Sequence, residues 1–123
     1  MLVRDLMTRD PITVLPKETL AQARAKMFSR KIRRLPVLSG KDLVGIISES
    51  DIRRCDAPLA STFVEEVMVP DAVTVESSAT AEHAVSLLTK NAIGSLPVLE
   101  RGKLVGMVSA KDLWVREPHA LPD

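Results

Sequence analysis

The chain has 123 residues, enough for one compact domain or two very small ones, and enough to bury a core of its own. Its formal net charge of +1 argues against a general nucleic-acid binder, and no apolar run approaches the roughly 20 residues that cross a bilayer. Only two Phe and one Trp are aromatic and there is no Tyr, so the core must be aliphatic.

Cysteine and histidine are too sparse to suggest chemistry. A lone Cys55 cannot form an internal disulfide, which fits a reducing compartment, the cytoplasm. His83 and His119 have no metal-ligand spacing with it, and no nucleophile–base pair is visible. We therefore expect no catalytic residue, no metal and no enzyme activity.

The first elements can be read from β-branched runs and helix signals. The run Ile12-Thr13-Val14 after Pro11 is typical of a short strand. A helix is expected next, because Thr19 followed by Gln22 forms a capping-box pattern and apolar residues then recur on one face.

Two strands and a second helix follow. Residues 35–38 read as a strand with Pro36 near its start, where a missing N–H is tolerated. A turn at Gly40 leads to a strand over 43–47, and Ser48 opens a helix to about Arg54. The order is β-α-β-β-α.

The same order then repeats. Shifted by 61 residues, the chain matches itself from residue 3 to residue 52 without a gap, with 17 of 50 pairs identical. LVGIISESD at 43–51 meets LVGMVSAKD at 104–112. The second copy predicts strands at 73–75, 96–99 and 104–108, and helices at 81–88 and 109–115. The halves differ in charge, since residues 1–61 carry +5 and residues 62–123 carry −4.

These motifs resemble the cystathionine-β-synthase (CBS) domain. Repeat 1 has MTRDPITV, LPV and LVGIISESD in order, and repeat 2 has MVPDAVTV, LPV and LVGMVSAKD at the matching positions. A tandem pair resembles the Bateman module. The resemblance implies an α/β (α+β) fold of two β-α-β-β-α repeats with pseudo-twofold symmetry. We expect repeat 1 at 1–55, a linker at 56–63, repeat 2 at 64–115 and a polar tail at 116–123.

The resemblance also implies a function. Such pairs bind adenosine-containing ligands in clefts between the repeats, here AMP, ADP or ATP, with S-adenosylmethionine or NAD as other candidates. We expect a regulatory nucleotide sensor that signals through a homodimer or a partner contact, with Trp114 near the dimer contact and neither membrane nor specific nucleic acid as a partner. The alternative is a ligand-free scaffold for protein–protein interaction.

The two Ser–Asp motifs allow two interpretations. Ser at a helix start with Asp three residues later is a capping box. A carboxylate in that first turn can also accept hydrogen bonds from a ribose diol, as the resemblance implies. We expect Ser48, Asp51, Ser109 and Asp112 to line the clefts, with both roles compatible.

Other ligand contacts follow from the resemblance. Arg33 and Arg34 precede the LPV strand and would meet phosphate, although a solvated helix end would also explain basic residues there. Copy two has Gly94 and Ser95 instead, so the two clefts should differ in phosphate binding. Adenine would meet Ile32, Leu35 and Pro36 in one cleft and Ile93, Leu96 and Pro97 in the other, with the hydroxyls of Thr13 and Thr74 nearby. We expect Asp51 to work with Thr74 and residues 93–97, and Asp112 with Thr13 and residues 32–36.

Overall fold

A computed structural model describes residues 1–116 of the chain. The chain forms two compact units, one of residues Ile12–Ala72 and the other of Met1–Pro11 with Val73–Asp123. We call them the first-repeat unit and the second-repeat unit. Of the expected tail at 116–123, Arg116 ends the last helix, and 117–123 lie outside the described residues.

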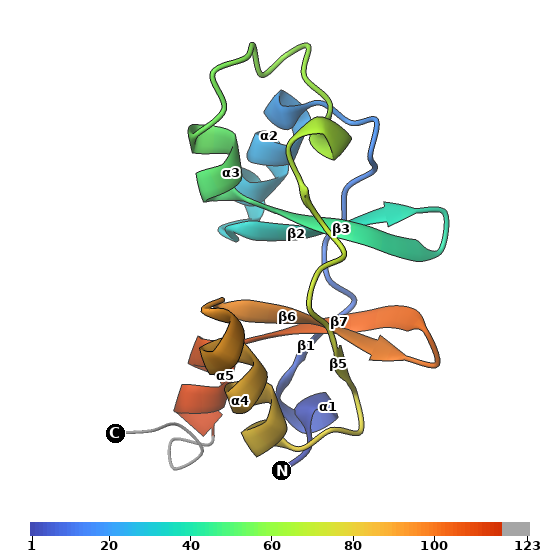
Figure 1. The fold of residues 1–123 in the computed structure, drawn as a ribbon, viewed down its shortest axis with the longest axis vertical. Coiled ribbons are helices and arrows are strands. Elements are labelled where there is room, and N and C mark those ends of the chain that lie inside the picture. The colour runs from blue at the N-terminus through green and yellow to red at the C-terminus, as the bar shows by residue number, and fades with distance from the viewer. Residues whose placement is uncertain (117–123) are drawn as a thin grey trace. The chain divides into compact units, whose positions relative to one another are not determined.

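The first-repeat unit is a β-hairpin covered by two helices. Its elements are α2 (Leu20–Arg30), β2 (Arg34–Ser39), β3 (Asp42–Ser48), α3 (Glu49–Arg53), the 3₁₀ turn η1 (Val64–Glu66) and β4 (Val69–Pro70). The sheet order is β2-β3-β4, with both pairs antiparallel. Both helices lie on the same side of the hairpin (Figure 1).

The second-repeat unit has the same plan. It contains α1 (Val3–Leu6), β1 (Thr8–Arg9), β5 (Val75–Glu76), α4 (Ala81–Asn91), β6 (Ser95–Glu100), β7 (Lys103–Ser109) and α5 (Ala110–Arg116). The sheet order is β1-β7-β6-β5, and α4 and α5 cover one side of the β6–β7 hairpin (Figure 1). The mixed α+β class and the repeated hairpin with two helices are confirmed.

The first segment of each repeat packs on the hairpin of the other repeat. Strand β1 pairs with β7, and the N–H of Val3 donates to the carbonyl of Ala79 at 2.8 Å. Likewise β4 pairs with β3, and the N–H of Val64 donates to the backbone carbonyl oxygen of Glu18 at 2.8 Å. The boundaries of the compact units therefore differ from those of the sequence repeats. The expected limits of the repeats stay a prediction.

Because the first segments are exchanged, the two compact units differ less in net charge than the two halves of the sequence. Residues 12–72 contain ten Lys/Arg and eight Asp/Glu, and residues 1–11 with 73–123 contain seven and eight. The units thus carry +2 and −1 in place of the +5 and −4 of the sequence halves.

The expected strand at 12–14 is reduced to one bridge between Val14 and Val37. Of the expected strand at 73–75, only Val75 lies in a strand, β5, which continues to Glu76. Pro16 explains the difference. Ser77 occupies the matching position in repeat 2 and donates its N–H to Leu99 at 2.9 Å, which extends the ladder. Proline has no N–H to donate, so the ladder stops in repeat 1.

Each unit has its own aliphatic core. Leu20, Leu35 and Ile47 are fully buried in the first-repeat unit, and Leu96, Val108 and Leu113 are fully buried in the second. None of the helices within residues 1–116 combines the length and apolar character that a bilayer crossing requires.

Candidate functional site

Asp51 sits in the first turn of α3 and caps it. Its Oδ2 accepts the N–H of Ser48 at 2.9 Å, and Ser48 Oγ accepts the N–H of Asp51 at 3.1 Å. The capping interpretation is therefore confirmed. The other carboxylate oxygen, Oδ1, accepts from Arg54 Nη2 at 3.0 Å, and the Asp51 side chain is 12% exposed.

Asp112 repeats the cap in α5 but not the ion pair. Its Oδ2 accepts the N–H of Ser109 at 2.9 Å, and Ser109 Oγ accepts the N–H of Asp112 at 3.2 Å. Among the side chains of residues 1–114, none donates to Asp112 Oδ1. One oxygen of this half-buried carboxylate therefore caps the helix, and the other can still accept hydrogen bonds.

The leucines of the two LPV strands belong to the hydrophobic cores. Leu35 and Leu96 are fully buried there, which leaves only their backbones for a ligand. Ile32 is half-buried and Ile93 is 38% exposed, so these two side chains can still offer an apolar surface.

A backbone acceptor and donor lie side by side before each of these strands. The N–H of Ile32 donates to the carbonyl oxygen of Met27 at 3.0 Å, and the carbonyl oxygen of Arg33 accepts the N–H of Glu49 at 2.8 Å. In the described part of the chain, the carbonyl of Ile32 and the N–H of Arg33 have no partner. Repeat 2 has the same pattern at Ile93 and Gly94. The N–H of Ile93 donates to the carbonyl oxygen of Leu88, and the carbonyl oxygen of Gly94 accepts the N–H of Ala110, both at 3.0 Å.

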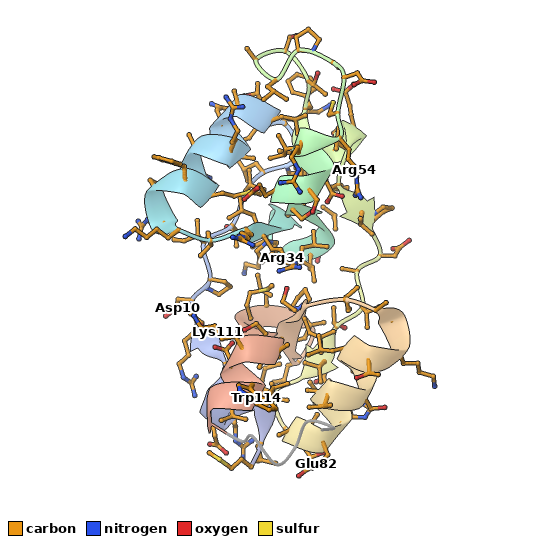
Figure 2. The ribbon with its side chains drawn as sticks, turned by 90° about the vertical axis from the view of Figure 1, so that its left-hand side faces the viewer. Asp10, Arg34, Arg54, Glu82, Lys111 and Trp114 are labelled. Atoms are coloured by element: carbon orange, nitrogen blue, oxygen red, sulfur yellow. The ribbon has the colours of Figure 1, made fainter. Side chains whose placement is uncertain are left out.

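The residues expected to meet phosphate differ between the repeats as the sequence indicated. Arg33 and Arg34 are both exposed, with Arg34 at the start of β2 (Figure 2). Arg33 lies 4.0 Å from Glu49, a distance that gives only a weak ion pair. Ser95, in the place of Arg34, is buried, and its hydroxyl has no hydrogen-bond partner among the described residues.

Thr13 and Thr74 are half-buried and lie outside any strand. The carbonyl of Thr13 accepts from Lys26 Nζ at 2.9 Å, so helix α2 holds this segment in place. Leu87 stands where Lys26 would be in repeat 2, so this restraint exists in one repeat only.

The structure brings together site residues of the same repeat. Register pairs Arg34 with Ser48 across β2 and β3, and Ser95 with Ser109 across β6 and β7. The expected partnership of Asp51 with residues 93–97, and of Asp112 with residues 32–36, joins different units and stays a prediction.

A groove that the sequence did not reveal lies in the first-repeat unit beside α2 and α3. Its volume is about 900 Å³. Seven apolar side chains and five charged ones line it: Met27, Phe28, Ile32, Ile52, Cys55, Ala57 and Leu59, with Arg24, Lys31, Arg33, Glu49 and Arg53. Phe28 is 85% exposed there. The packing of α2 and α3 creates it together with the segment after α3 that carries Cys55, Ala57 and Leu59.

The matching face of repeat 2 is almost uncharged. Val85, Ala92, Gly94 and Trp114 stand in the places of Arg24, Lys31, Arg33 and Arg53. Trp114, on α5, is 52% exposed (Figure 2). No group of three or more His, Cys, Asp or Glu side chains in residues 1–116 is arranged to hold a metal ion.

Comparison with known proteins identifies the repeated unit. The family model described as "CBS domain" matches residues 3–57 and again 64–113. A curated relative, inosine-5'-monophosphate dehydrogenase of Korarchaeum cryptofilum, is 38% identical over 112 residues, which is 90% of this chain and 23% of the dehydrogenase. The chain therefore spans less than a quarter of that relative.

Two solved structures are similar over nearly the whole length. The CBS domain pair of protein MJ0100, in complex with 5'-methylthioadenosine and S-adenosyl-L-methionine, is 27% identical with a TM-score of 0.84 and 92% coverage of both chains. CBSX2 in complex with AMP is 26% identical with a TM-score of 0.83 and 96% coverage of both chains.

Proposed function

Because this chain belongs to the CBS domain family, we propose that it is a regulatory module that binds an adenosine-containing ligand and does no chemistry on it. AMP, ADP and ATP are the first candidates, with S-adenosylmethionine and NAD as the others. The similar proteins crystallised with AMP and with S-adenosyl-L-methionine support this class of ligand.

The observation that carries the proposal is the divided role of Asp112. One oxygen caps α5, and the other has no donor within the described residues. A ribose diol offers two O–H donors, and hydrogen bonds to a charged acceptor are about twice as strong as neutral ones. A capping role alone does not require the second oxygen.

The backbone at residues 32–33 and 93–94 suits adenine. In both repeats, a carbonyl and a neighbouring N–H have no partner among the residues that the structure describes. Adenine presents an amino donor beside a ring-nitrogen acceptor, which is the complementary pair. Inosine replaces that amino donor with a carbonyl acceptor, so this recognition should exclude it.

Calorimetric titration with adenosine, inosine and AMP tests the proposal, together with a thermal-shift screen that adds ADP, ATP, S-adenosylmethionine and NAD. A bound ligand at 100 times its Kd adds about 2.7 kcal/mol to the free energy of unfolding. We expect adenosine and AMP to bind and inosine to fail. A flat response to all of these ligands would reject the nucleotide proposal.

In that case the second candidate, a ligand-free scaffold, is favoured. The groove beside Phe28 and the exposed indole of Trp114 support an assembly role in either case. We propose that two copies associate through their helix faces, with Trp114 at or near the contact. Ligand binding would then regulate this homodimer, or the contact with a protein partner, by binding one state more tightly.

A further inference from the structure

The two ribose-binding carboxylates of the proposed function are not equivalent in the structure. Both oxygens of Asp51 are engaged, Oδ2 by the N–H of Ser48 at 2.9 Å and Oδ1 by Arg54 Nη2 at 3.0 Å. Arg54 follows α3, and its side chain is 74% exposed (Figure 2). The guanidinium thus holds the oxygen that has no donor at Asp112, and a ribose hydroxyl approaching Asp51 Oδ1 would share that oxygen with it or displace it.

Repeat 2 provides an internal control for the role of Arg54. The position that matches Arg54 is Val115, a residue type whose side chain carries neither a hydrogen-bond donor nor a charge. Yet α5 forms and keeps the same Ser109–Asp112 cap with bonds of 2.9 and 3.2 Å. The guanidinium is therefore not needed to build this helix start.

We infer, on the basis of the proposed function, that Arg54 is a specificity-determining residue that competes with ribose for Asp51, so that the Asp112 site fills first. An exposed ion pair of this kind is weak, and displacing it should lower ribose affinity about two- to fivefold. The competition is electrostatic, so added salt should relieve it.

The competition should act on adenosine itself, since it concerns the ribose and not a phosphate. This separates the inferred role from a second one that the same side chain could play. If Arg54 instead contacted a phosphate, its removal would weaken AMP binding and leave adenosine binding unchanged.

The test isolates the Asp51 site by placing Asp112→Asn in the full chain. Asparagine keeps an oxygen that can accept the N–H of Ser109, so the cap is retained while the charged acceptor is lost. In this background we compare Arg54→Val, the residue that repeat 2 carries, with the unchanged Arg54 by calorimetric titration of adenosine. We expect Arg54→Val to raise the affinity about two- to fivefold.

A matched control removes a positive charge of the same unit other than the one paired with Asp51 in the described residues. Arg30→Asn does this, because Arg30 lies at the end of α2 and repeat 2 carries Asn91 there. It should leave adenosine affinity unchanged. Raising the salt concentration should increase adenosine affinity with Arg54 present and have no such effect in Arg54→Val.

The outcomes separate the inference from the proposed function on which it rests. If the parent chain binds no adenosine, the proposed function fails and the inference falls with it. If the parent binds adenosine and Arg54→Val leaves the affinity unchanged or lowers it, only the inference is overturned. Circular dichroism checks that each variant folds, and Arg54→Gln, a longer neutral side chain, replaces Arg54→Val if the latter does not.

Discussion

The carboxylate of Glu18 lies 3.0 Å from the ammonium of Lys26, which also donates to the carbonyl oxygen of Thr13 at 2.9 Å. The same carboxylate accepts the N–H of Leu15 at 3.0 Å. Lys26 thus ties α2 both to Glu18 and to the segment of Thr13, which the proposed function places near the ligand.

This arrangement predicts a pH dependence of stability. Burial by itself would raise the pKa of Glu18, but the hydrogen bond from Leu15 and the ammonium of Lys26 outweigh it and hold the pKa below its ordinary value. A lowered folded-state pKa gives stability that is fully present above the unfolded pKa of about 4.3 and is lost as the pH falls through the folded pKa.

Urea unfolding between pH 6 and pH 3 (roughly spanning that value) measures the effect. Glu18→Gln keeps an oxygen for Leu15 but cannot titrate, so its stability should fall less steeply with acid than that of the parent. Equal acid slopes in the two proteins would show that Glu18 does not contribute.

The starts of α2, α3 and α5 could be predicted from sequence, whereas α1 and the partners of the strands could not. Capping is local: Thr19 and Gln22, three residues apart, make the predicted reciprocal bonds at 3.2 and 2.8 Å. The exchange of β1 and β4 depends on which hairpin is nearer in space, and the repeat has no sequence signal for that.

Two further features of the structure have a signal in the sequence. Pro16 in place of Ser77 foretells the missing strand in repeat 1 by the absence of a donor. The spacing of Asp51 and Arg54, three residues apart, is typical of a helical ion pair. The groove beside Phe28, by contrast, requires the packed positions of two helices.

Gly106 is predicted to be irreplaceable because a strand crosses it closely. A Cβ at this position would lie 2.6 Å from Met7 Sδ and 2.8 Å from the carbonyl oxygen of Thr8. The flexible sulfur could move, but the backbone oxygen is held by the β1–β7 pairing. Gly106→Ala should therefore destabilise the chain by about 1–3 kcal/mol and loosen β1.

Urea unfolding and amide exchange at β1 measure these two effects. Adding Met7→Ala to Gly106→Ala should not restore stability, because the clash with Thr8 remains. Gly40→Ala serves as a control, since its Cβ meets nothing within 4 Å and only its positive φ of 62° costs energy. Full rescue by Met7→Ala would contradict the argument from the backbone.

Trp114 is predicted to anchor a homodimer. It is 52% exposed on α5, and a buried Trp often dominates an interface, with losses of 2 kcal/mol or more on truncation. Trp114→Ala should weaken the dimer by roughly thirtyfold or more while secondary structure is unchanged.

Sedimentation over a concentration series measures this change. Leu15→Ala is the matched control, because Leu15 is 55% exposed and lies outside the helices. A parent protein that stays monomeric at tens of micromolar, roughly the range of a weak specific dimer, would reject the prediction.

Arg33 and Arg34 are predicted to make the two ligand sites unequal toward phosphate. Both are exposed, and repeat 2 offers Gly94 and Ser95 in their places. A charge-assisted hydrogen bond is worth roughly 1.5–3 kcal/mol, or about ten- to hundredfold in affinity, and less where salt screens it. Changing both arginines to Ala should lower AMP affinity by about that factor and leave adenosine binding nearly unchanged.

Calorimetry with AMP and adenosine decides this prediction, and single-site variants assign the effect. We expect Asp51→Asn and Asp112→Asn each to abolish a different site while keeping its helix cap. The phosphate preference should then survive in Asp51→Asn and be lost in Asp112→Asn, because residues 32–36 are expected to serve the Asp112 site. If the double arginine variant loses AMP and adenosine affinity equally, the arginines shape the site and do not hold phosphate.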